Sequence, residues 1–180
     1  MRLLRGIGSA ANRMARLIDD ILGIARLASS ALVRRPIDLS ALAANVIAEL
    51  HASQPERRVD FQLQPDMRVD GDENLFTLAL QHLLQNAWRY TATTPDARIE
   101  FGKRADDGAE VHFVKDNGVG FDMRYARKIF EDFQRLDTTV HGRSGTGVGL
   151  ALVQRVIKRH GGRIWAEATV GHGAAFYFTI

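Results

Sequence analysis

The sequence of 180 residues contains no cysteine and no long hydrophobic run. Without cysteine, disulfide bonds and thiolate chemistry are excluded, which suits a reducing cytoplasm without requiring one. No stretch approaches the roughly 20 apolar residues that cross a bilayer, and none has the apolar core of a signal peptide. We therefore expect a cytoplasmic chain with no membrane segment, whose parent protein could still be attached to a membrane.

The sequence also lacks an excess of one sign of charge. It has 24 Lys and Arg residues against 21 Asp and Glu residues, for a net charge of +3. The basic residues are spread along the chain and are not gathered with aromatic residues in one stripe, so a nucleic-acid partner is disfavoured. The length is sufficient for one core of standard domain size plus an appended element.

What the sequence does contain is a pair of glycine clusters. The first, Asp116–Gly120, follows an apolar run and should lie at the end of a strand. There Asp116 could accept a hydrogen bond from the exocyclic amine of adenine, while the glycines let the backbone approach a flat ring. The second, Gly145–Leu150, runs into a helix whose first N–H groups suit phosphate. Each cluster alone could be an ordinary turn, but together they favour one nucleotide held from two sides.

A helix is predicted upstream of both clusters, over residues 72–90. Asp72 is a typical N-cap residue, and the residues after it indicate a largely buried helix. Helical spacing brings four polar residues toward one face: His82, Asn86, Arg89 and Tyr90. The Asn86 amide oxygen could bind Mg²⁺ beside phosphates, Arg89 could meet a phosphate, and Tyr90 could stack on a base. Alternatively, the four residues only form the solvent edge of a buried helix.

Together these elements resemble the ATP-binding domain of sensor histidine kinases, within the superfamily that includes gyrase B and mismatch-repair ATPases. Residues 83–91 are similar to the N box of that family, 116–120 to its G1 box, 129–136 to its F box and 145–150 to its G2 box. The four motifs occur in the family's order, and the resemblance covers nearly the whole chain. Within the family the sequence looks most similar to kinases coupled to PAS or phytochrome-type sensors.

The resemblance implies a role for each motif, with ATP and Mg²⁺ as ligands. Asn86 would bind the metal, Arg89 the phosphates, Tyr90 the adenine face and Asp116 the adenine amine. The implied nucleotide-binding residues of the two glycine clusters are Gly118, Gly120, Gly145, Thr146, Gly147, Val148, Gly149 and Leu150. Residues 121–144 would form a lid over ATP, packed against the body by Phe130 and Phe133. The alternative for this segment is a solvated surface loop with a short helix.

Two positions depart from the family's pattern. His82 lies one turn before Asn86, where histidine kinases commonly carry Asn and ATP-hydrolysing relatives carry a Glu that activates water. An imidazole can act as a general base, but without the Glu we expect no steady hydrolysis. Ala174 and Ala175 stand where relatives often have a hydroxyl residue, which leaves one polar contact near the adenine open.

The first residues, 1–37, are predicted to form a helical stem. Apolar residues recur on alternating three- and four-residue steps from Leu4 to Leu32, a heptad seam that needs a partner helix. The helix is expected to end near Arg34–Pro36, and Asp38 to cap another helix through about residue 51. In the resembled family, this region is the second helix of the dimerisation and histidine-phosphotransfer domain, which implies a possible homodimer.

The phosphoacceptor expected of that domain is missing from this sequence. None of the six histidines lies in the family's His-Glu/Asp-x-Arg-x-Pro setting: His51, His82, His112, His141, His160 and His172. We expect no autophosphorylation of the usual kind, and a chain that is a fragment or acts on the histidine of another chain. Structural or surface roles are favoured for His51, His112 and His160.

Alternating apolar residues predict half-buried strands at 59–63, 99–101, 111–113 and 176–180. With helices on one face, these strands predict a two-layer α/β sandwich, which the resemblance identifies as the Bergerat-type ATP-binding fold. Hairpin turns are expected at Pro65–Asp66 and at 106–108. The predicted domains are the stem, 1–37, and an ATP-binding domain, 38–180.

Three functional classes follow from these observations. The first is the catalytic ATP-binding part of a two-component histidine kinase, which would transfer the γ-phosphoryl group to a histidine outside this chain and signal to a response regulator. The second is an ATPase or serine kinase of the same superfamily, against which the stem and the missing Glu argue. The third is a non-catalytic nucleotide-binding or dimerisation module, which the missing phosphoacceptor supports.

Overall fold

The computed structural model describes residues 31–106, 108–132, 134 and 147–180. Most of the predicted stem, together with Phe133, His141, Gly145 and Thr146, lies outside these residues. The elements are β1 (Arg35–Asp38), α2 (Leu39–Ser53), β2 (Asp60–Leu63), β3 (Arg68–Gly71), α3 (Glu73–Tyr90), β4 (Arg98–Asp106), β5 (Ala109–Asp116), η1 (Met123–Tyr125), η2 (Lys128–Phe130), α4 (Gly149–Arg159), β6 (Ile164–Thr169) and β7 (Gly173–Phe178).

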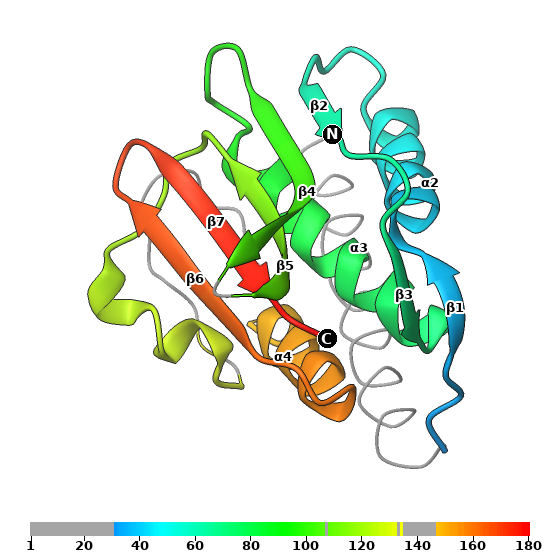
Figure 1. Cartoon of the computed structure of the whole chain (residues 1–180). Coiled ribbons are helices and arrows are strands. Elements are labelled where there is room, and N and C mark those ends of the chain that lie inside the picture. The colour runs from blue at the N-terminus through cyan, green and yellow to red at the C-terminus, as the bar shows by residue number, and fades with distance from the viewer. Residues whose placement is uncertain (1–30, 107, 133, 135–146) are drawn as a thin grey trace, which may run out of the picture.

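The main sheet has five strands in the order β2-β4-β5-β7-β6. Strand β2 runs parallel to β4, and the other pairs are antiparallel. The helices lie on one face of this sheet (Figure 1), and β1 and β3 form a separate two-stranded antiparallel sheet. The predicted two-layer α/β sandwich is therefore confirmed.

Helix α3 lies at the centre of the helical layer and packs against both α2 and α4. Its apolar side is buried against the sheet, where Leu80, Leu83 and Leu84 are fully inaccessible. The sheet contributes residues such as Phe101 and Phe178 to the same core. The polar side of α3 therefore faces away from the core.

Asp residues start two of the helices, as the sequence predicts. The Asp72 carboxylate accepts hydrogen bonds from the N–H groups of Asn74 and Leu75, and thereby caps α3. Asp38 caps α2 in the same way. Helix α4 differs, because its N-cap residue is Val148, whose own side chain makes no capping hydrogen bond. Among the described residues, no helix is both long and apolar enough to span a membrane.

Residues 33–35 attach the chain before β1 to the helical layer. The N–H of Val33 donates to Asp72 (3.2 Å), Arg34 donates to the carbonyl of His160 (2.6 Å), and Arg35 forms an ion pair with Glu73 (2.5 Å). Residues 31–34 are not helical, and Leu32, the last position of the predicted heptad seam, packs against the core. Residues 35–38 form a strand, so the stretch just before position 38 packs with the rest of the described chain.

The structure corrects one predicted turn and adds strands that the sequence did not reveal. Pro65–Asp66 is not a hairpin turn, because the strands on either side of it belong to different sheets: β2 pairs with β4, and β3 pairs with β1. The hairpin at 106–108 is confirmed by the pairing of Asp106 with Ala109. Strands β1, β3 and β6 were not predicted, and β7 ends at Phe178.

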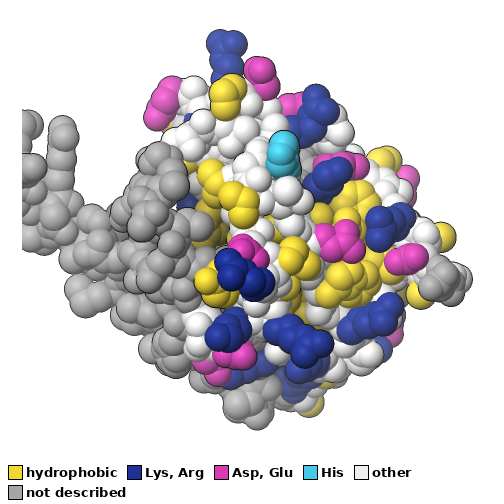
Figure 2. Space-filling model, turned by 90° about the vertical axis from the view of Figure 1, so that its left-hand side faces the viewer, with side chains coloured by type: hydrophobic (Ala, Val, Ile, Leu, Met, Phe, Trp, Pro, Cys, Tyr) yellow, Lys and Arg dark blue, Asp and Glu magenta, His cyan; other side chains and the backbone are white. Residues whose placement is uncertain are grey.

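The face of the sheet away from the helices carries a second, smaller apolar cluster. Phe113, Tyr177 and Trp165 lie in one cross-strand row. The guanidinium groups of Arg104 and Arg163 cover Tyr177 and Trp165, at 4.6 and 4.9 Å from the ring centroids. Figure 2 shows apolar side chains between Lys, Arg, Asp and Glu side chains on the side of the molecule that it views. The two guanidinium groups therefore cover part of the apolar cluster formed by Tyr177 and Trp165.

His160 joins the end of α4 to the start of α3 and is 2% exposed. The N–H of Asp72 donates to Nε2 (3.0 Å), so Nδ1 carries the proton and donates to the carbonyl of Val156 (2.8 Å). Burial lowers the pKa of His160, and the charges of Arg34 and Arg159 act in the same direction. The Val156 hydrogen bond and Asp72 oppose this shift without cancelling it. The folded protein therefore favours neutral His160.

This arrangement predicts how stability depends on pH. A histidine whose pKa is lower in the folded than in the unfolded state leaves stability intact above about pH 6.5 and reduces it as the pH falls below that value. We expect His160→Leu to lower the free energy of unfolding by about 2 kcal/mol at pH 7.5, and by clearly less at pH 5. Urea denaturation at both pH values measures the difference.

His172→Leu is the matched control, because His172 is exposed and its replacement should change stability by less than about 0.5 kcal/mol at either pH. A His160→Leu effect of the same size at pH 7.5 and pH 5 would contradict the role assigned to the neutral imidazole.

Candidate functional site

Asp116 ends β5 and is only 5% exposed. Its Oδ1 accepts a hydrogen bond from the N–H of Gly118 (2.9 Å), and the N–H of Ala174 also bonds to the carboxyl group. Burial raises the pKa of Asp116 to about 6, and these two hydrogen bonds oppose the rise. Among the described residues, no ion pair involves Asp116. A buried carboxylate without a cationic partner is a strong acceptor for a neutral N–H donor such as an amine on a base.

The first glycine cluster contacts the C-terminal end of α3. The N–H of Val119 donates to the carbonyl of Tyr90 (3.2 Å). A side chain at Gly118 would place its Cβ 2.5 Å from the same carbonyl oxygen and 2.8 Å from Asp116 Oδ1. Glycine is therefore required at 118 so that the loop can approach α3 this closely, and the loop holds Asp116 beside Tyr90.

The same loop rests on the turn between β6 and β7. Gly120 has φ +60°, and a Cβ there would overlap the carbonyl oxygen of Thr169. The N–H of Gly171 donates to the carbonyl of Val119 (2.8 Å). Sequence reasoning did not assign Thr169 or Gly173 to this region, although the glycines at 171 and 173 mark a tight turn there. The turn between β6 and β7 therefore packs directly against the first glycine cluster.

The second glycine cluster contacts α3 at His82, one of the four polar residues predicted to share a face of that helix. A Cβ at Gly149 would lie 2.7 Å from Nδ1 of His82 and 3.3 Å from its Cγ. Gly149 is also the first residue of α4. The imidazole therefore packs directly against the start of α4, which brings the N-terminus of that helix to the polar face of α3.

Asn86 lies midway between these two contacts. It is one helical turn after His82 and one before Tyr90, and that spacing puts the two contact points about 12 Å apart along α3. Its side chain is half-buried and makes no hydrogen bond to any other described residue. The structure thus brings both glycine clusters to one face of α3, with an amide available between them.

The other predicted nucleotide-binding residues differ in how far their side chains are buried. Arg89 is half-buried and Tyr90 is 39% exposed on the same helix. Gly147 has φ +75°, directly before Val148, whose side chain is buried, and Leu150 packs against the core. The side chains of Val148 and Leu150 therefore contribute to packing. Only the backbone of these two residues, at the start of α4, is left to contact a nucleotide. Gly145 and Thr146 lie outside the described residues.

The described part of the predicted lid is attached to the body by aromatic contacts. Phe130 packs edge-on against Phe176 (6.4 Å between centroids), as predicted, and Phe121 packs against the same ring. Arg155 of α4 forms an ion pair with Asp132 (2.5 Å). The segment after the first glycine cluster is therefore connected both to the sheet and to α4.

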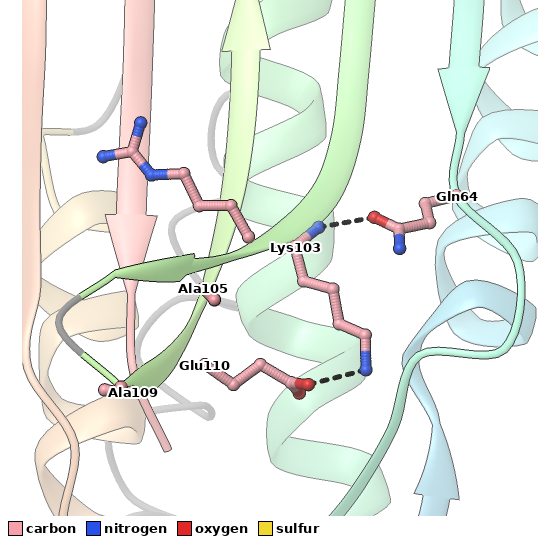
Figure 3. A pocket seen from close by; sticks show the side chains of 7 residues that line it. Gln64, Lys103, Ala105, Ala109 and Glu110 are labelled. Atoms are coloured by element: carbon pink, nitrogen blue, oxygen red, sulfur yellow. Dashed lines mark hydrogen bonds and ion pairs between the residues drawn. The ribbon is translucent and has the colours of Figure 1, made fainter.

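A cavity of about 360 Å³ lies elsewhere, at the β4–β5 hairpin (Figure 3). Lys103 and Glu110 form an ion pair there (2.6 Å), and Gln64 accepts a hydrogen bond from the N–H of Lys103 (2.8 Å). This cavity adjoins the start of β5, whereas Asp116 lies at its end. Lys103 and Glu110 already bond to each other and Arg104 pairs with Asp106, so the face of α3 between the glycine clusters is the better candidate site.

A two-layer α/β domain in which two glycine loops meet one polar helix face is suited to binding a nucleotide between the loops. Residues 71–180 match the family of histidine kinase-, DNA gyrase B- and HSP90-like ATPases. The chain therefore belongs to this family, and its matching part is the ATP-binding catalytic domain of the histidine kinase type.

Individual relatives agree with this placement. Methanogenesis regulatory histidine kinase FilI of Methanothrix harundinacea is 41% identical over 113 residues, which are 63% of this chain and 12% of FilI. Phytochrome-like protein Cph1 of Synechocystis sp. is 33% identical over 168 residues, 93% of this chain and 22% of Cph1. The crystal structure of full-length ShkA in complex with AMPPNP matches with a TM-score of 0.74 and 26% identity, over 98% of this chain and 37% of ShkA. This chain thus spans about a fifth or less of the length of these curated relatives.

The geometry of Asp116 predicts opposite effects of one substitution on stability and on binding. A carboxyl whose pKa rises to about 6 on folding destabilises the folded state progressively as the pH rises from about 4 to 6, and fully above that. We expect Asp116→Asn to raise the free energy of unfolding by about 2 kcal/mol at pH 7.5 and to have little effect at pH 4. We also expect it to weaken ATP binding at least about tenfold, because one carboxylate oxygen becomes an NH2 donor and the amine of the base loses a charged acceptor. Urea denaturation and titration calorimetry measure the two effects.

Asp106→Asn is the control, because Asp106 is exposed at the other end of the same hairpin. It should leave both quantities unchanged. If wild-type protein bound ATP and GTP equally well, Asp116 would not read the base.

Proposed function

We propose that this domain binds ATP with Mg²⁺ and transfers the γ-phosphoryl group to a histidine on a phosphotransfer helix of the same or a partner kinase chain. The observation that carries the proposal is the arrangement on α3. Gly118 meets the helix at Tyr90, Gly149 meets it at His82, and Asn86 lies between them. A nucleotide held by both loops would place its phosphates over Asn86.

Each residue in this arrangement receives a role that its environment supports. Asp116 accepts a hydrogen bond from the adenine amine, since it is buried and has no cationic partner among the described residues. Tyr90 covers the adenine face, and Arg89 contacts the phosphates. The backbone of Gly147–Leu150, together with Gly145 and Thr146 of the predicted cluster, surrounds the phosphate end.

Magnesium fits the chemistry of this site. The described residues contain no group of three or more His, Cys, Asp or Glu side chains that could hold a metal ion by themselves. Mg²⁺ commonly keeps several waters and takes few protein oxygens together with substrate phosphates. The Asn86 amide, which makes no hydrogen bond to another described side chain, supplies one such oxygen. The bound ion would neutralise charge on the phosphates.

The proposed reaction needs little covalent chemistry from the protein. The bond between the γ-phosphorus and its bridging oxygen breaks, a bond from phosphorus to the acceptor imidazole nitrogen forms, and ADP leaves with the negative charge. Positioning and charge neutralisation dominate such transfers. Asn86 and Arg89 serve both purposes, whereas the Glu that would activate water is replaced by His82, so hydrolysis is disfavoured.

The domain division and the partners belong to the same proposal. Residues 1–37 would be a partial dimerisation and phosphotransfer helix, and 38–180 the ATP-binding domain. The stem would support a homodimer, a response regulator would receive the signal downstream, and the site of action would be the cytoplasm. The sequence similarity to FilI and Cph1 supports a role in signal transduction.

Incubation with γ-labelled ATP and Mg²⁺, with and without a supplied histidine-containing phosphotransfer hairpin, tests the function. We expect label on the hairpin, and none on this chain alone. Free labelled phosphate without label on the hairpin would indicate an ATPase instead. ATP binding without transfer would indicate a non-catalytic module, which the six histidines outside the family's acceptor motif also allow.

Replacement of the proposed metal ligand should remove the reaction but not the fold. We expect Asn86→Ala to reduce transfer to the hairpin by at least about 100-fold, because Mg²⁺ loses its protein ligand. The midpoint of urea denaturation should stay within error of wild type, because the Asn86 side chain makes no hydrogen bond to a described residue. Gln85→Ala, at the exposed neighbouring position, should keep full activity. Unchanged transfer by Asn86→Ala would reject Asn86 as the ligand.

A further inference from the structure

The contact between His82 and Gly149 connects the two helices that form the phosphate end of the proposed pocket. Nδ1, Cγ and Cε1 of the ring lie 2.7, 3.3 and 3.4 Å from the position of a Cβ at residue 149. These three atoms come from one edge of the ring, so the imidazole lies directly on the backbone of the first residue of α4. No other described atoms are that near.

This contact explains why residue 149 is glycine. Gly149 lies within α4, and its φ is not positive, unlike those of Gly120 and Gly147. Its backbone could therefore be adopted by alanine, which is a better helix former. The space taken by the His82 ring is the physical reason that a residue without a side chain is needed at this position.

Neither helix can easily move to relieve a change at the contact. On α3, Leu83 and Leu84 follow His82 directly and are fully buried, and on α4, Leu152 and Val153 are equally inaccessible. Protein cores are close-packed and tolerate changes in volume poorly. The His82 ring therefore sets the distance between α3 and the first turn of α4.

We propose that His82 is a positioning residue that sets the width of the phosphate end of the ATP pocket. It acts by holding the first N–H groups of α4 at a defined distance from Asn86. The adenine end depends on a different contact, between Gly118 and Tyr90. His82 should therefore govern the binding of the triphosphate and leave the binding of the base unaffected. This inference rests on the proposed function.

A double-mutant cycle on the full chain tests the contact. The four proteins are wild type, His82→Ala, Gly149→Ala and the double variant, and MgATP and adenosine are titrated into each by calorimetry. We expect His82→Ala to weaken MgATP binding about tenfold and adenosine binding less than about twofold. Gly149→Ala should weaken MgATP binding more than about tenfold in the presence of His82, but by less than about threefold in the His82→Ala background.

Thermal unfolding of the same four proteins gives a readout that does not depend on ligand. Gly149→Ala should lower the melting temperature when His82 is present. In the His82→Ala background it should raise the melting temperature, because the added methyl group then has room and alanine favours the helix. Gln85→Ala, exposed on the same helix, is the control and should change neither binding nor melting.

The outcomes separate this inference from the proposed function. Suppose that wild type binds MgATP. If Gly149→Ala then weakens MgATP binding by the same factor with and without His82, or if His82→Ala weakens the binding of MgATP and of adenosine by the same factor, the positioning role is wrong and the ATP site stands. If wild type binds no ATP, the proposed function is overturned and the inference with it.

Discussion

The apolar side of α3 packs against the helix-facing side of the sheet, and this contact determines the direction of the proposed site residues on α3. Leu80, Leu83 and Leu84 are fully buried, so α3 cannot rotate without exposing them. Because a helix repeats every 3.6 residues, fixing these leucines also fixes the direction of Asn86. The hydrophobic core therefore orients the polar residues of α3, although these residues are not part of the core.

A second constraint is the burial of Asp116 without a cationic partner in the described part of the chain. Such a group costs free energy in the absence of compensating hydrogen bonds. Two backbone N–H groups, from Gly118 and Ala174, provide part of the compensation. They come from the loop after β5 and from β7, so the same contacts that make the carboxyl tolerable also join the first glycine cluster to the sheet. The buried carboxyl of Asp116 thus lowers the free energy of unfolding of the domain. Such a cost is common where function requires a particular group.

The sequence predicted local features well and contacts between distant segments poorly. The Asp72 cap, the length of α3 and the place of Asp116 at a strand end follow from residues close together in the chain. Strand β6 was missed because two of its three inward positions, after Ile164, are Ala166 and Ala168, which give weak alternation. The turn at Pro65–Asp66 was recognised by its residues, but its flanking strands pair with other strands, which local chemistry does not show. For the same reason, glycine at 149 predicted a loop near phosphate but not the packing of His82 against it.

The three bonds at residues 33–35 have a mechanical consequence. Val33, Arg34 and Arg35 attach to Asp72, His160 and Glu73, which lie at the start of α3 and just beyond the end of α4. A force on the chain that precedes Val33 would therefore not be absorbed by a slack linker. It would act on the first turn of α3 and on the residue that follows α4, and because the buried leucines resist rotation of α3, that helix would pass the force on as one rigid body to Asn86, more than three helical turns away.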